Sequence, residues 1–160
     1  MVTEGESAPD FELQGAHDGE IGSFRLSEFL EGRPVVLTFY IHDFSPICTE
    51  QVCELNDMEF LTFNDDVAVL GISLDGPWSH RQYAAEEDVS YPLLSDTNKQ
   101  VYRDYGMIEQ TASSELEPRR GIVVVDTDET VRYRWVADDN WDSWNIEPLH
   151  EANDVINEII

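Results

Sequence analysis

The order of apolar segments along this 160-residue chain predicts an α/β fold, a three-layer α/β/α domain with a central mixed sheet. Short runs rich in β-branched and aromatic residues, typical of buried strands, alternate with longer segments whose apolar residues recur at helical spacing. No internal repeat, low-complexity tract or linker divides the sequence. We therefore expect one domain over residues 1–160, a length that suits a single hydrophobic core.

The first predicted elements surround the candidate chemistry. Residues 35–40 are β-branched and aromatic and follow Arg33-Pro34, which predicts a buried strand. Residues 43–46 contain Pro46 and end that strand. A helix is expected from Ile47 through about residue 60, because apolar residues lie at helical spacing at Val52, Leu55, Met58 and Leu61.

The same patterns predict a strand at 67–74, a helix at 79–87, a strand at 91–94, a helix at 98–105 and a hairpin of strands at 122–125 and 131–136. We expect Ser79 to cap the second helix and Gly106 to end the third. A final helix carries one apolar stripe, formed by Ile146, Leu149, Val155, Ile156, Ile159 and Ile160. This order of elements suits a thioredoxin-like fold.

The chain is strongly acidic, with 34 Asp and Glu against 9 Lys and Arg and a formal net charge of −25. Such a charge repels nucleic acid and anionic lipid, so we expect neither nucleic acid nor membrane as a partner. Lys99 is the single lysine. This acid-rich, lysine-poor balance resembles that of proteins from halophiles that accumulate salt, and we expect a halophilic cytoplasm, the alternative being an ordinary acidic protein.

The cellular setting decides how the two cysteines, Cys48 and Cys53, are interpreted. No segment approaches the roughly 18 apolar residues of a membrane helix, and residues 1–10 are polar and acidic, unlike a secretory signal. We therefore expect a cytoplasmic protein. Permanent disulfides are rare there, which favours catalytic, redox-sensing or metal-binding cysteines.

Cys48 follows a strand, a turn and the first residues of a helix. The first helical turn presents unpaired N–H groups and a partial positive charge, and both favour a thiolate over a thiol. Ser45, three residues earlier, offers a hydroxyl to the sulfur or to a substrate. A guanidinium beside the sulfur would act in the same sense, and on chemistry alone Arg119 and Arg120 are equal candidates.

Cys53 follows Cys48 by five residues in the same predicted helix. Helix geometry places Cα atoms at that spacing roughly 8.5 Å apart, whereas a disulfide needs less than about 7 Å. If the two sulfurs join, at least the first turn of the helix must unwind. A zinc site that includes Cys48, Cys53 and His42 is a weaker alternative, because a fourth ligand is not evident.

Residues 39–53, which read FYIHDFSPICTEQVC, resemble the active-site signature of peroxiredoxins, Pro-x-x-x-Thr/Ser-x-x-Cys. They are most similar to the branch of bacterioferritin comigratory protein, the Q type of the AhpC/TSA superfamily, which often has a second cysteine five residues on. Three further segments resemble the family, at residues 5–11, 69–75 and 91–96. Two positions depart from it: Ile41 replaces the proline of the signature, and Glu129 replaces a glycine in the turn after Asp126.

The resemblance implies a role for each candidate residue. Cys48 would be the peroxidatic cysteine and Cys53 the resolving one, closing an intramolecular disulfide. Arg120, six residues before Asp126, falls where the family has its active-site arginine, and Gln51 falls where a Glu or Gln supports it.

The implied activity is a thiol peroxidase for hydrogen peroxide and organic hydroperoxides, recycled by a thioredoxin-like dithiol. No metal, haem or flavin is implied, and both a monomer and a homodimer fit. A peroxide sensor that relays oxidation to a protein partner is the alternative function. A thioredoxin-type disulfide reductase is disfavoured, because that chemistry uses two cysteines separated by two residues.

Overall fold

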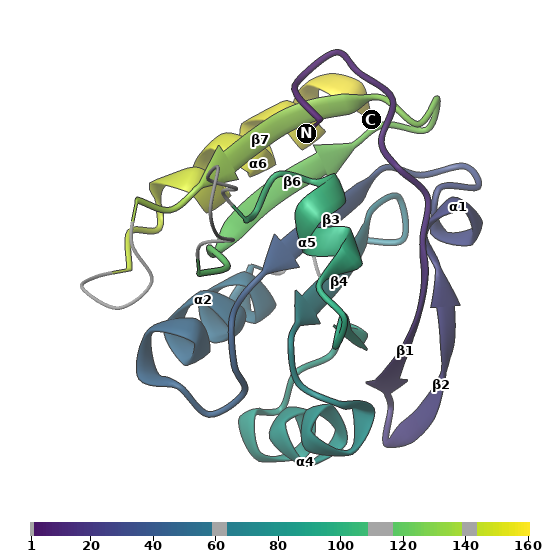
Figure 1. Ribbon diagram of the computed structural model, residues 1–160. Helices are drawn as coiled ribbons and strands as arrows, with labels where there is room; N and C mark the ends of the chain where they lie inside the picture. The colour runs from purple at the N-terminus through teal and green to yellow at the C-terminus, as the bar shows by residue number, and fades with distance from the viewer. Residues whose placement is uncertain (1, 59–63, 109–116, 139–143) are drawn as a thin grey trace, which may run out of the picture.

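The computed structural model describes residues 2–58, 64–108, 117–138 and 144–160 (Figure 1). Within them lie seven strands: β1 (Glu12–His17), β2 (Glu20–Arg25), β3 (Val35–Phe39), β4 (Ala68–Ser73), β5 (Leu93–Ser95), β6 (Gly121–Val125) and β7 (Val131–Val136). The helices of these ranges are α1 (Leu26–Phe29), α2 (Pro46–Asp57), α4 (Pro77–Glu87), α5 (Gln100–Asp104) and α6 (Glu147–Ile159).

All seven strands form one mixed sheet in the order β2-β1-β5-β4-β3-β6-β7. Neighbours β3, β4 and β5 run parallel, whereas the pairs β1–β2, β1–β5, β3–β6 and β6–β7 are antiparallel. Every residue of β3 and of β4 is buried, as expected for strands covered on both faces. The predicted thioredoxin-like α/β fold with a mixed sheet is confirmed.

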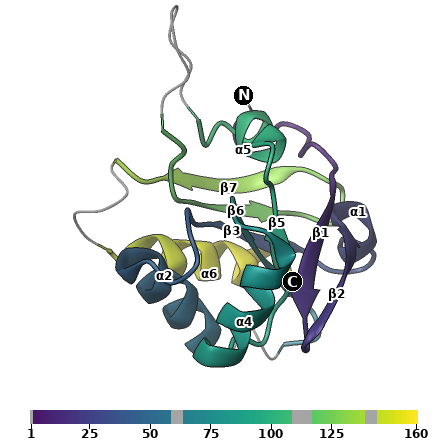
Figure 2. The ribbon, with the colours of Figure 1, turned by 60° about the horizontal axis from the view of Figure 1, so that its bottom comes forward.

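The sheet is covered on both sides, with α2, α4 and α6 on one face and α5 on the other (Figure 2). Neighbouring residues of β3 show how the two faces are used, because side chains alternate along a strand. Thr38 accepts a hydrogen bond from Gln51 of α2, while the ring of Phe39 packs edge-on against Tyr102 of α5, with centroids 5.2 Å apart. None of the described helices is long and apolar enough to cross a bilayer.

Several predicted boundaries shift by a few residues. Helix α2 begins at Pro46 and ends at Asp57, and the part of the expected helix beyond residue 58 lies outside the described ranges. Helix α4 begins at Pro77 after Gly76, so the expectation that Ser79 caps it is wrong. Proline at the first helical position has its φ already suited to the helix, which explains the earlier start.

The two later helices can also be compared with their predictions. Gly106 has a φ of +70° just after α5, as predicted for the residue that ends this helix. The stripe on α6 buries Leu149 and Ile156, but Ile160 at its end is 50% exposed.

The sequence analysis missed the hairpin formed by β1 and β2. Its signal was the dipeptide Asp18-Gly19, whose residues have φ values of +52° and +80°. Two successive positive φ values are what a tight two-residue hairpin turn requires, and Asp-Gly is among the preferred pairs. At the other hairpin, Glu129 takes the left-handed conformation with a φ of +67°, at the position where the family was expected to have glycine.

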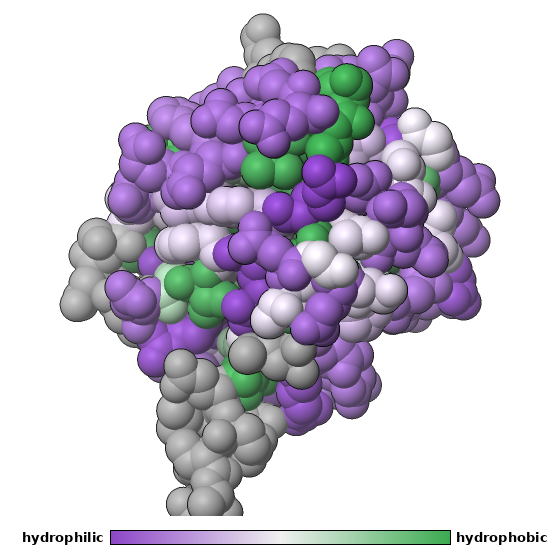
Figure 3. Space-filling view, turned by 90° about the horizontal axis from the view of Figure 1, so that it is seen from above, coloured by the Kyte–Doolittle hydropathy of each residue, from purple (hydrophilic) through white to green (hydrophobic). Residues whose placement is uncertain are grey.

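Hydrophilic residues cover most of the face drawn in Figure 3, with apolar residues gathered in a few small areas. This agrees with a surface that carries most of the chain's charge while β3, β4 and β6 form the buried core.

A test of this packing uses Gly15 of β1, which pairs with Gly22 of β2. A Cβ atom at Gly15 would lie 2.5 Å from the Leu93 carbonyl oxygen, whereas at Gly22 its nearest neighbour would be a Phe24 side-chain carbon at 3.9 Å. We expect Gly15→Ala to lower the free energy of unfolding by about 2 kcal/mol, because the sheet must shift to relieve the overlap. Gly22→Ala is the matched control and should change it little. Urea denaturation of both variants measures the difference, and equal stabilities would contradict this packing.

Candidate active site

Cys48 lies at the third residue of α2, after Ser45 at the N-cap and Pro46 at the first helical position. Its side chain is fully buried. The sulfur therefore sits in the first turn of the helix, where backbone N–H groups have no intrahelical partner. This is the placement that the sequence predicted.

The Cys48 sulfur accepts a hydrogen bond from the backbone N–H of Ile41, with an N to Sγ distance of 3.3 Å. Ile41 is the second residue after the end of β3 and is 2% exposed. A proline at this position would have no N–H to donate. The departure of Ile41 from the family signature therefore adds a donor to the sulfur as well as a packing side chain.

Gln51 joins α2 to the neighbouring strand and to Arg120. It is fully buried, and its Nε2 donates to Thr38 Oγ1 at 2.7 Å and to the Phe39 carbonyl at 3.0 Å. Its Oε1 accepts from Arg120 Nη1 at 3.4 Å. Residues three apart on a helix share one face, so this contact brings the guanidinium to the side of α2 that carries Cys48.

Arg119 and Arg120 have different surroundings. Arg120 is 2% exposed, its backbone directly precedes β6, and its guanidinium carbon lies 5.8 Å from the centre of the Trp144 ring. Arg119 is half-buried and donates to the carbonyl of Asp138. Because β6 pairs with β3, it is Arg120 that the sheet delivers to the N-terminal part of α2.

The Ser45 hydroxyl donates to the carbonyl of His42 at 3.1 Å, within the loop that connects β3 to α2. The imidazole of His42 itself lies 3.2 Å from a carboxylate oxygen of Asp75. The Ser45 hydroxyl thus donates its proton within the loop, and its oxygen can still accept hydrogen bonds.

A buried carboxylate, Asp43, anchors the same loop. It accepts hydrogen bonds from Tyr40 and Ser79, each at 2.7 Å, and lies 2.8 Å from Nδ1 of His80. The other ring nitrogen of His80 lies 3.0 Å from the Leu94 carbonyl, so both nitrogens face oxygen acceptors. His80 is fully buried. The network fixes the loop before Cys48 to the start of α4 and the end of β5.

Cys53 lies on another side of α2 from Cys48. It is half-buried, and its thiol donates to Glu87 Oε2 on α4 at 3.5 Å. Burial, followed by the neighbouring Glu87 carboxylate, raises the pKa of the Cys53 thiol to about 11. Both cysteines are free thiols, and α2 is continuous between them.

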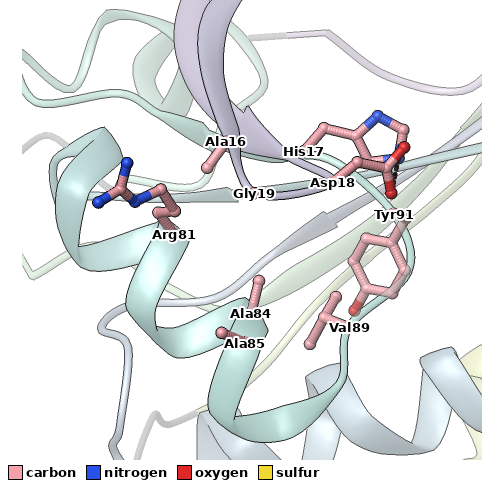
Figure 4. Close-up of a pocket in the computed structure, with 9 residues that line it drawn as sticks. All are labelled: Ala16, His17, Asp18, Gly19, Arg81, Ala84, Ala85, Val89 and Tyr91. Atoms are coloured by element: carbon pink, nitrogen blue, oxygen red, sulfur yellow. Dashed lines mark ion pairs between the residues drawn. The ribbon is translucent and has the colours of Figure 1, made fainter.

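A small hollow of about 90 Å³ lies elsewhere, between α4 and the turn that joins β1 to β2 (Figure 4). Arg81, Ala84 and Ala85 of α4 line it together with His17 and Tyr91. Neither Cys48 nor Cys53 belongs to its lining, so this hollow is separate from the surroundings of the two sulfurs.

Two contributors to the site were missed by the sequence analysis. His80 carried no usable signal, because its partner Asp43 is 37 residues away and only folding brings them together. The Ile41 amide did have a signal, since replacing a proline by any other residue creates an N–H.

Known proteins resemble this chain in sequence. The pattern of the AhpC/TSA family matches residues 5–134. Peroxiredoxin prdx-2 of Caenorhabditis elegans is 32% identical over 143 residues, covering 84% of this chain and 68% of that protein. A selenocysteine-containing peroxiredoxin, PrxU, of Peptoclostridium acidaminophilum is 35% identical over 137 residues, covering 80% of this chain and 64% of that protein.

Solved structures of other proteins share the fold of this chain. Peroxidoxin BcpB of Mycobacterium tuberculosis superimposes with a TM-score of 0.82 at 27% identity, covering 100% of this chain and 99% of that one. The bacterioferritin comigratory protein of Xanthomonas campestris gives a TM-score of 0.68 at 19% identity, covering 81% and 82% of the two chains. The second likeness concerns the fold alone.

The hydrogen bond from Ile41 to the sulfur can be tested by chemical reactivity. We expect Ile41→Pro to slow alkylation of Cys48 by iodoacetamide at neutral pH by about three- to tenfold, because the thiolate loses a donor. Alkylation is best measured in a Cys53→Ser background, where Cys48 is the single thiol. Ile41→Val keeps the N–H and most of the side-chain volume, and should react at nearly the original rate. A proline variant that is folded and alkylated as fast as the valine variant would show that this N–H does not activate the sulfur.

Proposed function

Since this chain belongs to the AhpC/TSA family of peroxiredoxins, we propose that it is a thiol-dependent peroxidase in which Cys48 attacks the hydroperoxide. The observation that carries this proposal is the setting of the Cys48 sulfur. It is buried in the first turn of α2, accepts the N–H of Ile41 and lies one helical turn before Gln51, the partner of Arg120. Backbone amides and a nearby guanidinium all favour a thiolate.

In the first step the thiolate of Cys48 attacks one oxygen of the hydroperoxide. An S–O bond forms and the O–O bond breaks, so the sulfur is oxidised to a sulfenic acid and the peroxide is reduced. The other oxygen leaves as water or an alcohol after taking up a proton. Arg120 is suited to hold a peroxide oxygen during this step, because its guanidinium presents several N–H donors in a fixed plane.

In the second step Cys53 attacks the sulfenic acid of Cys48. An S–S bond forms, the S–O bond breaks, and hydroxide leaves as water with the thiol proton. The intact helix holds the two Cα atoms at the spacing of residues five apart, roughly 8.5 Å, beyond the reach of a disulfide. The segment between the cysteines must therefore unwind before they join.

The cycle closes when an external dithiol of the thioredoxin type reduces the disulfide by two exchange steps and is itself oxidised. Ser45 and Gln51 are proposed as supporting residues, Ser45 for the peroxide and Gln51 for Arg120. Within the family we propose the Q-type branch, on the spacing of Cys48 and Cys53. A cytoplasmic location fits the use of free thiols and of a reducing partner.

The function is tested by peroxide consumption with dithiothreitol as reductant. Cys48→Ser should lose activity to background, because a hydroxyl in this setting is not ionised. Cys53→Ser should still reduce the first equivalent of peroxide but form no intramolecular disulfide. Non-reducing mass spectrometry then separates the variants, since only the original chain should lose two hydrogens within one peptide that spans both cysteines. Activity retained by Cys48→Ser would end the proposal.

We also propose that the net charge of −25 is an adaptation to concentrated salt. Going from about 0.1 M to about 1 M KCl shortens the screening length from about 10 Å to about 3 Å, which weakens repulsion between carboxylates. We expect the melting temperature to rise by about 5 °C over this range, and the rate of peroxide reduction to rise as well. Equimolar NaCl serves as a control for effects specific to potassium. Stability and activity that both fall steadily with added salt would contradict the adaptation.

A further inference from the structure

Helix α2 is joined to α4 by side-chain hydrogen bonds along one face. The Tyr83 hydroxyl of α4 donates to Thr49 Oγ1 at 2.8 Å, and the Cys53 thiol donates to Glu87 Oε2 at 3.5 Å. Thr49 and Cys53 are four residues apart on α2, as are Tyr83 and Glu87 on α4, so the two contacts lie one helical turn apart. The two helices lie beside each other under the sheet (Figure 2).

A third contact continues the row beyond the second cysteine. The Asn56 side chain donates to the Asp88 carbonyl at 2.9 Å and accepts the backbone N–H and the hydroxyl of Ser90 at 2.9 and 2.8 Å. Asn56 lies three residues after Cys53 and therefore on the same face of α2. We call the contacts of Thr49 and Cys53 with Tyr83 and Glu87 the α2–α4 row.

The proposed disulfide places different demands on the three contacts. Joining Cys48 to Cys53 requires the residues between them to leave the helical conformation. Thr49 lies within that segment and Cys53 ends it, so their contacts with Tyr83 and Glu87 must open. Asn56 lies beyond the segment, and its contacts with Asp88 and Ser90 can remain as an anchor for the rest of α2.

We propose that Tyr83 and Glu87 are positioning residues for the resolving step: they hold α2 wound and keep the Cys53 thiol unreactive until the helix opens. This inference rests on the proposed peroxidase function. Its consequence is that the α2–α4 row, together with the contacts of Gln51 in the same segment, sets how readily α2 opens for resolution.

The charges around Cys53 act in the same direction. Burial in the first place, and then the facing carboxylates of Glu87 on α4 and Asp57 on α2, raise the pKa of Cys53 to about 11. The hydroxyls of Tyr83 and Tyr91 also lie near, and burial raises the pKa of both, so they stay neutral. At neutral pH the folded protein therefore holds Cys53 as a thiol, which is a poor nucleophile.

Unwinding removes both the burial of Cys53 and its contact with the Glu87 carboxylate. Once Cys53 leaves Glu87 and enters water, its pKa returns towards the ordinary value of about 8.5, and more of it is thiolate at the moment it can reach Cys48. The pKa of Cys53 is higher in the wound helix than after unwinding, so the Cys53 thiol contributes its full stabilisation of the wound state below about pH 8.5. This stabilisation is lost as the pH rises through the folded value of about 11.

The speed of opening decides between two fates of the Cys48 sulfenic acid. Attack by Cys53 gives the disulfide and water. Attack on a second hydroperoxide instead adds another oxygen to the sulfur, breaks the O–O bond, releases water or an alcohol and yields a sulfinic acid. A tight α2–α4 row delays the disulfide and so favours the sulfinic acid at high peroxide.

The first experiment follows the reactivity of Cys53 in a Cys48→Ser background. Alkylation by iodoacetamide as a function of pH should have its midpoint near the pKa of about 11. Glu87→Gln removes the facing charge, and we expect the midpoint to fall by about one unit. Glu86→Gln is the matched control, because it removes the same charge from the exposed neighbour of Glu87, which contacts Gln82 on its own helix.

The second experiment measures the competition itself in the chain with both cysteines. The readout is the peroxide concentration at which half of Cys48 becomes sulfinic acid, determined by mass spectrometry with dithiothreitol present. Removing the charge that faces Cys53 with Glu87→Gln, or removing the hydrogen bond to Thr49 with Tyr83→Phe, should raise this concentration by about three- to tenfold. Glu86→Gln should leave it unchanged.

The outcomes distinguish a failure of the peroxidase function from a failure of the gating role of Tyr83 and Glu87. If Cys48 of the original chain forms no sulfenic acid with peroxide, the proposed function fails. If sulfenic acid and disulfide form but the Glu87 and Tyr83 variants match Glu86→Gln in both experiments, the peroxidase stands and the gating role is overturned. Thermal melts of the three variants separate a local effect on α2 from global destabilisation.

Discussion

The buried amide of Gln51 is the contact on which the geometry of the site depends. Its Nε2 donates hydrogen bonds to the carbonyl of Phe39 at the end of β3 and to the hydroxyl of Thr38. Its Oε1 accepts a hydrogen bond from the guanidinium of Arg120. Leaving such groups buried without partners is costly, which makes this arrangement hard to rearrange. The helix that carries Cys48 is thereby held against the strand before it, and the arginine before β6 is held against the helix.

Two requirements on α2 oppose each other. The wound helix places Cys48 in its first turn, where backbone N–H groups have no intrahelical partner, but it also keeps Cys53 out of reach. The loop before Cys48 is anchored by Asp43 and His80, and the end of the helix by Asn56. The segment between the cysteines meets α4 through one hydrogen bond at each of Thr49 and Cys53. The same segment meets β3 and Arg120 through Gln51.

How far prediction from sequence succeeded differs between local and distant contacts. The strand expected at residues 35–40, the helix expected from Ile47 and the place of Cys48 in its first turn all rest on neighbouring residues. The structure has the strand at 35–39, the helix from Pro46, one residue earlier, and Cys48 in the first turn. The β1–β2 hairpin was missed although Asp18-Gly19 marks it locally. Gln51 and Arg120 were paired by resemblance to a family, since no local pattern relates residues 69 positions apart.

The sequence by itself determined the α/β order, the spacing of Cys48 and Cys53 in one helix and, from that spacing, the need for unwinding. These are properties of short segments, where helix geometry relates residues directly. Only the tertiary structure decided that Ile41 donates to the sulfur, that His80 holds the loop through Asp43 and that Glu87 faces Cys53. The last two pairs join residues 37 and 34 positions apart, and the packing of helices on a shared sheet face, not the chain between them, sets such distances.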